Sequence, residues 1–231
     1  MTAAQQRKSR HATASLAAGI TLGGALIAAA VGYVGFVLWP RHLSEVPPDS
    51  PAVPITVAGV VFNVPPAAIR QQVQRRSGAQ DRIDLVFLWP SLDPPDPAKH
   101  GPPSDEPHPI DRLFVTIAGG DGTLSPAERV KTIYPRYMAG PARPEPSGLS
   151  ARAFGDDTPY KGEDLLFDPA APERFVARCS RDGATPGICL MERRIGAADI
   201  TMRFPREWLA DWRDLAARVD YLMAVLRPPG R

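Results

Sequence analysis

The stretch that decides the fold is 173-ERFVARCSRDGATPGICLMERRIGAADITMRF-204. Its apolar side chains alternate with polar ones, which is the pattern of strands buried on one face. A loop between Ser180 and Ile188 contains two glycines and a proline, and it separates the first strand from the second. The pattern predicts three antiparallel strands over residues 173–180, 188–195 and 199–204.

Cys179 and Cys189 are the two cysteines of the chain, and they flank this loop. Pairing them across the first two strands places Phe175 and Met191 on the same face as both sulfurs, although Arg193 interrupts that face. Redox motifs place their cysteines much closer together, at the start of a helix. We therefore expect a structural disulfide, which contributes on the order of 2–3 kcal/mol by restricting the unfolded chain.

The opposite face of the same strands carries charged side chains. Three of them are arginines, Arg178, Arg194 and Arg203, and Glu192 lies among them. Guanidinium groups bind carboxylates and phosphates through paired hydrogen bonds, so this face is a candidate surface for an anionic ligand or a partner. The solvated side of a half-buried sheet would show the same composition.

Further elements surround this unit. Apolar, β-branched segments predict strands over 55–64, 82–89 and 110–118, with shorter ones over 149–154 and 164–167. Proline-led starts predict helices over 67–76 and 125–134, and a helical apolar period predicts a long helix over 206–226. Residues 90–109 hold eight prolines and predict a surface loop. We expect one α+β domain over 55–231, with a single mixed or antiparallel sheet and a long C-terminal helix.

Residues 16–39 carry no charged side chain over 24 positions. A helix of that length measures about 36 Å, against a hydrocarbon core of about 30 Å, so we expect a transmembrane helix. It follows a basic tail over 1–15 and precedes a proline-rich tether over 40–54. The positive-inside rule predicts a single-pass inner-membrane protein with a cytoplasmic N-terminus and a periplasmic C-terminal domain.

Two other properties of the apolar segment bear on its role. A cleaved signal peptide ending near residues 28–30 is the alternative to an anchor, although its apolar region is usually about 7–15 residues long. Gly19 and Gly23 are spaced so that two such helices can approach closely, which would permit a weak homodimer.

The net charge of +2 divides unevenly along the chain. Arg7, Lys8 and Arg10 supply +3, whereas residues 40–231 hold 24 basic and 25 acidic side chains and carry −1. A nearly neutral exported domain lacks the electrostatic footprint of a nucleic-acid-binding protein. We therefore expect the membrane and a protein as partners, and no nucleic acid.

The sequence shows no catalytic, cofactor-binding or metal-binding constellation. All four histidines lie in the tail, the tether or the proline-rich loop, away from rigid elements that would hold a catalytic base. That loop also contains metal-ligand types without a scaffold to set their geometry: His100, Asp105, Glu106 and His108. The alternative function is a periplasmic hydrolase that works through carboxylates without a histidine. Its candidate acids are Asp156, Asp157, Glu163 and Asp164.

Several short motifs resemble a group of uncharacterised bacterial proteins. They are FVARC at 175–179 with CL at 189–190, RFPREWLADW at 203–212, and IDL at 83–85 with WP at 89–90. Proteins of that group have one N-terminal membrane anchor and a small exported domain. The resemblance implies this architecture and no activity. We therefore expect a non-catalytic binding or assembly module of the cell envelope.

Overall fold

The computed structural model describes residues 24–25, 27–34, 46–47, 49–96, 110–120 and 122–227. The chain divides into two compact units, 1–44 and 45–231. In the first unit, residues 24–25 and 27–34 are helical. No helix within the described ranges is long and apolar enough to cross a membrane. The predicted tail, most of the predicted anchor, part of the predicted tether and residues 97–109 of the predicted loop lie outside these ranges, so the membrane anchor stays a prediction.

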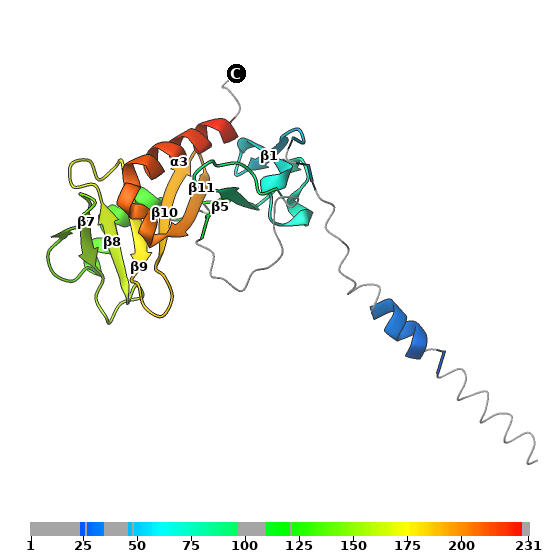
Figure 1. The fold of residues 1–231 in the computed structure, drawn as a ribbon, viewed down its shortest axis with the longest axis horizontal. Coiled ribbons are helices and arrows are strands. Elements are labelled where there is room, and N and C mark those ends of the chain that lie inside the picture. The colour runs from blue at the N-terminus through cyan, green and yellow to red at the C-terminus, as the bar shows by residue number, and fades with distance from the viewer. Residues whose placement is uncertain are drawn as a thin grey trace, which may run out of the picture. The chain divides into compact units, whose positions relative to one another are not determined.

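The second unit is built on an eight-stranded antiparallel sheet (Figure 1). It combines the three strands of the deciding stretch with five others. Their order across the sheet is β4 (Arg82–Leu88), β5 (Arg112–Gly119), β11 (Ala198–Pro205), β10 (Ile188–Ile195), β9 (Val176–Ser180), β8 (Glu163–Phe167), β7 (Ser150–Ala153) and β6 (Arg143–Pro144).

A smaller mixed sheet has the order β2 (Val60–Val64), β1 (Val53–Val57) and β3 (Gly78–Ala79). The segment predicted as one strand over 55–64 is therefore a hairpin. Ala58 and Gly59 form its two-residue turn with positive φ angles of 48° and 78°. Two successive positive φ values match the hairpin turn that follows the natural twist of paired strands. The domain has α+β architecture, as predicted, but with two sheets instead of one.

The register of the deciding stretch confirms the sequence prediction. Cys179 lies opposite Cys189, and Met191 lies opposite Met202. All four side chains are buried in the main core. Arg193, which interrupts this face, forms an ion pair with Asp220 of the C-terminal helix. The helix therefore supplies the partner for the charged side chain that interrupts the core face of these strands.

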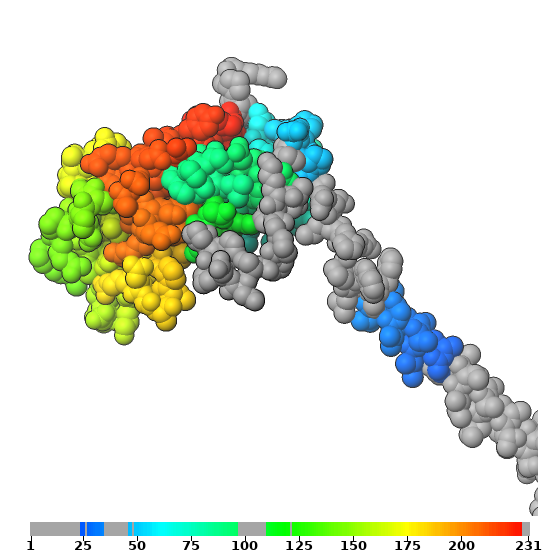
Figure 2. All heavy atoms as spheres, in the orientation of Figure 1, coloured from blue at the N-terminus to red at the C-terminus, as the bar shows by residue number. Residues whose placement is uncertain are grey.

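The C-terminal helix, α3 (Trp212–Leu226), packs its apolar side chains into this main core. Figure 1 shows it lying across β10 and β11, and Figure 2 shows its outer side at the surface. Residues predicted as its first turns form a 3₁₀ helix instead, η5 (Arg206–Asp211). With three residues per turn, Leu209 and Trp212 fall on the same side, and both are buried.

A short helix, α2 (Pro126–Thr132), covers part of the other sheet face and continues into the 3₁₀ helix η4 (Tyr134–Arg136). Its start is the predicted capping box, in which Ser125 and Glu128 satisfy each other's backbone amides. A second, smaller apolar cluster forms beneath these helices around Tyr134, Phe154 and Leu165.

The helix predicted over 67–76 is wrong. The chain makes two separate 3₁₀ turns, η1 (Pro66–Ala68) and η2 (Gln72–Gln74), on either side of an isolated bridge between Ile69 and Leu85. Ile69 is 1% exposed, whereas Val73, one helical turn later, is 76% exposed. The segment thus lacks the apolar stripe that packs a helix, and pairing Ile69 with the sheet buries its side chain instead.

Candidate functional site

An open groove of about 290 Å³ lies where three segments of the second unit meet. The segments are the β6–β7 turn, the β9–β10 loop and η5. The groove is lined by Glu145, Pro146, Ser147, Leu166, Asp182, Pro186, Arg206, Glu207, Leu209 and Ala210. Its volume falls near the lower end of the range for ligand pockets, roughly 300–1,000 Å³.

The disulfide fixes the first wall of the groove. Cys179 and Cys189 are bonded, as predicted, and both are fully buried at the base of the β9–β10 loop. Within the loop, the backbone amide of Gly187 donates to Asp182 Oδ1 at 2.8 Å. The Gly187 carbonyl accepts a hydrogen bond of 2.8 Å from the amide of Arg206. The loop is therefore held at both ends and against η5, and Figure 2 shows this part of the chain (yellow) at the surface.

A buried carboxylate fixes the second wall. Asp164 on β8 is 3% exposed and lies opposite Cys179 in the sheet. Its two oxygens form ion pairs of 3.0 Å each, Oδ1 with Arg181 and Oδ2 with Arg206. Burying a carboxylate is costly unless its charge is paired, and here both oxygens have a cationic partner. The pair with Arg206 ties the start of η5 to the sheet.

The third wall is the turn between β6 and β7. The indole nitrogen of Trp212 donates a hydrogen bond of 3.1 Å to the carbonyl of Ser147. The amide of Glu145 donates to the carbonyl of Leu149 at 2.8 Å, which closes the turn. Because Trp212 is itself 1% exposed, the turn is attached directly to the core.

The rim of the groove is acidic and its interior is partly apolar. Glu145, Asp182 and Glu207 line it, and its one basic lining residue, Arg206, is paired with Asp164. Within the described part of the chain, neither Glu145 nor Glu207 has an ion-pair partner. No group of three or more His, Cys, Asp or Glu side chains is placed to hold a metal ion among the residues that the structure describes. A groove that combines carboxylates with proline and leucine side chains suits a peptide segment in which a basic residue stands next to an apolar one.

The predicted partner surface lies elsewhere, on the face of the sheet opposite the main core. Three of its four residues are engaged in ion pairs: Arg178 with Glu163, Glu192 with Arg129 at 2.9 Å, and Arg194 with Asp199 at 2.6 Å. The fourth, Arg203, is exposed. Arg203 thus differs from the other three residues, whose ion pairs hold α2 and neighbouring strands together. The role of this face in binding stays a prediction.

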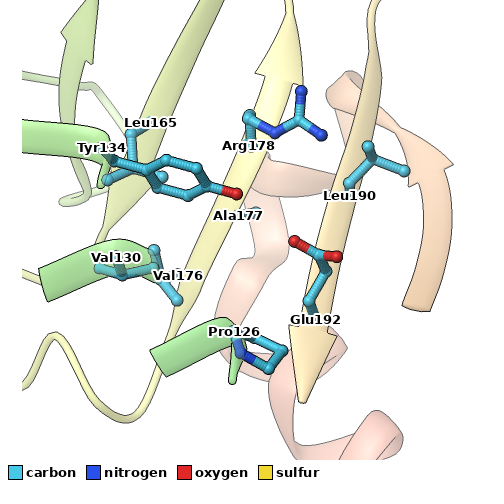
Figure 3. A pocket seen from close by; sticks show the side chains of 9 residues that line it. All are labelled: Pro126, Val130, Tyr134, Leu165, Val176, Ala177, Arg178, Leu190 and Glu192. Atoms are coloured by element: carbon cyan, nitrogen blue, oxygen red, sulfur yellow. The ribbon is translucent and has the colours of Figure 1, made fainter. Parts of the chain in front are cut away.

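A small cavity of about 20 Å³ lies among these charges beneath α2 (Figure 3). The hydroxyl group of Tyr134 points between Arg178 and Glu192. Burial, reinforced by the charge of Glu192, raises the pKa of Tyr134. Burial alone would lower the pKa of Arg178, but the hydrogen bond and charge of Glu163 raise it. The cavity has room for about one water molecule and is too small for a larger ligand.

The carboxylates suggested for a hydrolase are not gathered into one site. Glu163 binds Arg178, and Asp164 binds two arginines, whereas Asp156 and Asp157 are exposed in the turn before β8. The candidate metal ligands of the proline-rich loop, residues 100–108, lie outside the described ranges.

Comparisons with known proteins show a likeness of fold. No protein-family model matches the chain, and no curated protein sequence matches it. Smlt3025, an immunity protein of the Stenotrophomonas maltophilia type IV secretion system, is similar with a TM-score of 0.50 and 12% identity, over 78% of this chain and 94% of its own. FrpD, an iron-regulated outer membrane lipoprotein of Neisseria meningitidis, gives a TM-score of 0.39 and 10% identity, over 78% and 92%.

Proposed function

We propose that this chain is a membrane-anchored, non-catalytic binding module of the cell envelope. It holds a basic segment of a partner protein in the groove between the β6–β7 turn, the β9–β10 loop and η5. The observation that carries the proposal is the groove's construction: the disulfide, the Asp164–Arg206 pair and the Trp212–Ser147 hydrogen bond each fix one wall. Such preorganisation lowers the entropic cost of binding.

The charge of the rim supports a basic occupant. Glu145 and Glu207 are not neutralised by other described residues, so a lysine or arginine of a partner gains their attraction without breaking an existing ion pair. The apolar part of the groove accommodates the aliphatic portion of such a side chain. The chain shares its fold with Smlt3025, an immunity protein of a type IV secretion system, and a non-catalytic role in the cell envelope is consistent with that likeness.

The location proposed is the outer side of the inner membrane, with residues 16–39 as the anchor. The disulfide supports an oxidising compartment, since such bonds persist mainly outside the cytosol. Alkaline phosphatase fused after Arg231 should be active, because the enzyme needs an oxidising compartment to fold. The intact mass should retain residues 1–39. An inactive fusion would contradict the topology, and loss of the first thirty or so residues would contradict the anchor.

Site-specific photocrosslinking in intact cells tests the binding site. A photoreactive benzoylphenylalanine replaces Ala210, an exposed residue inside the groove, or Ala217, an exposed residue of α3 outside it. We expect a discrete crosslinked product from Ala210 and none from Ala217. Adding Glu145→Gln and Glu207→Gln should reduce the product about tenfold, because both substitutions keep shape and remove charge. Equal products from the two positions, or no effect of the charge substitutions, would contradict the proposed site.

A further inference from the structure

A second surface of the domain is basic and partly apolar. The segment 70-RQQVQRR-76 contains three arginines and no acidic residue. Val73 stands at its centre with 76% of its surface exposed, more than any other large apolar side chain among the described residues of the second unit. Arg70 and Arg76 are exposed as well. We name the exposed residues Arg70, Val73 and Arg76 the arginine–valine turn.

Hydrogen bonds hold this turn in one conformation. The Arg75 guanidinium donates to the carbonyl of Ile69 at 3.1 and 3.2 Å. The Gln74 carboxamide oxygen accepts a hydrogen bond of 2.9 Å from the amide of Asp84 on β4. Hydrogen bonds thus tie Gln74 and Arg75 to the fold, and Val73 lies exposed beside them.

The turn lies where the chain enters the domain. Strands β1 and β3 are parallel, with Ile55 opposite Gly78 and Thr56 opposite Ala79. In a parallel pair, the residues that precede the two strands lie at the same end. The segment 70–76 therefore leads into β3 at the end of the small sheet where β1 begins. Residues 40–54 form the predicted tether, so the turn flanks the point at which the tether joins the domain.

Both arginines of the turn, Arg70 and Arg76, lack an ion-pair partner within the described part of the chain. Arg70 lies over the ring of Phe114, with its guanidinium carbon 4.9 Å from the ring centre, and this contact leaves its charge uncompensated. No ion pair involves Arg76 among the same residues. Unpaired arginines beside an exposed aliphatic side chain are the combination that interfacial segments use on anionic membranes.

We propose that the arginine–valine turn docks on the anionic lipid surface next to the membrane anchor and so orients the domain. This inference rests on the proposed anchor. Because β1 begins at Val53, the predicted tether comprises at most thirteen residues, 40–52. It keeps the turn near the bilayer at a high effective concentration, so a weak contact is sufficient for docking. Arg70 and Arg76 meet lipid phosphates, and Val73 enters the headgroup region.

Fluorescence quenching in vesicles tests the docking. The full chain is reconstituted in vesicles that contain either phosphatidylglycerol with phosphatidylcholine or phosphatidylcholine alone. A bimane label is attached at Val73→Cys, or at Ala170→Cys as an exposed control outside the turn. Both native cysteines are consumed by the disulfide, so the new thiol is labelled selectively. We expect headgroup spin-labelled lipid to quench the label at position 73 in anionic vesicles only, and the label at position 170 in neither.

Charge substitutions complete the test. Arg70→Gln with Arg76→Gln should weaken docking roughly 25-fold, at about fivefold per arginine. The control is Arg136→Gln with Arg143→Gln, two exposed arginines outside the turn, which should leave the quenching unchanged. Equal quenching at positions 73 and 170, or in both kinds of vesicle, would overturn the inference. Shielding of position 73 in cell membranes but not in anionic vesicles would assign the turn to a protein and overturn it too. A chain that fails to float with the vesicles would instead refute the proposed anchor.

Discussion

Breaking the disulfide should lower the free energy of unfolding and loosen the β9–β10 loop that lines the groove. Cys179 and Cys189 are separated by 10 positions in sequence, so the closed loop is short. The chain-entropy relation gives about 2.7 kcal/mol for a loop of that size at 25 °C. For a domain of this length the loss corresponds to a fall in the unfolding midpoint of about 5–11 °C. The double variant Cys179→Ala/Cys189→Ala should lose at least as much, because both buried sulfurs also leave the core.

The measurement is urea unfolding of the full chain in detergent micelles, followed by tryptophan fluorescence with and without a reducing agent. Reduction should destabilise the natural sequence and leave the double variant unaffected, which separates the disulfide from side effects of the reductant. The reasoning would be refuted if reduction changed the free energy of unfolding by less than about 0.5 kcal/mol, the scatter expected of an ordinary surface change.

Three further predictions concern the same domain. Asp164→Ala should cost about 3 kcal/mol in urea unfolding because it leaves Arg206 without its partner inside the fold; a cost below 1 kcal/mol would contradict the role given to the pair. Gly187→Ala should destabilise the β9–β10 loop, because a Cβ there would collide with a backbone carbonyl, whereas Gly183→Ala in the same loop meets nothing within 4 Å and should be nearly neutral in thermal unfolding. Although burial opposes it, hydrogen bonds lower the pKa of Asp84, so the contribution of this carboxylate to the free energy of unfolding is complete above about pH 4 and is lost as the pH falls further. Asp84→Asn should therefore flatten the loss of stability between pH 5 and pH 2.5. An unchanged pH profile would exclude that contribution.

The fold was most predictable from the sequence where a periodic pattern of apolar residues and a disulfide indicated the same strand pairing. In the stretch 173–204, the alternation of side chains and the position of the cysteines agree, and the structure confirms both the pairing of Cys179 with Cys189 and the buried face of the three strands. The capping box at Ser125 was equally reliable, because it depends on contacts within four residues.

Prediction failed where distant contacts decided the local conformation. The segment 67–76 has a proline-led start typical of a helix, yet Ile69 pairs with Leu85 and prevents one. The alternation correctly places Glu192 on the face opposite the core, but it does not show that α2 covers part of that face, where Arg129 pairs with Glu192. The role of this face in binding stays a prediction. Strand alternation identifies the face of a sheet, and it carries no information on what later covers that face.

The groove could not be found from the sequence for a similar reason. Glu145, Asp182 and Glu207 are far apart in the chain and belong to a turn, a loop and a 3₁₀ helix. None of these segments has a periodic pattern. The disulfide is the one local signal near the groove. Its cysteine spacing predicts a stabilising crosslink, but it does not reveal that the β9–β10 loop lines a groove.

Selection from a displayed library of random heptapeptides, on the full chain in lipid nanodiscs, tests the central claim that the groove binds a basic segment. The account predicts that selected peptides are enriched in lysine or arginine next to apolar residues. They should bind the variant Glu145→Gln/Glu207→Gln at least tenfold more weakly, and bind the control Asp156→Asn/Asp157→Asn, with the same loss of charge outside the groove, unchanged. Peptides without basic residues, or equal affinity for both variants, would contradict the account.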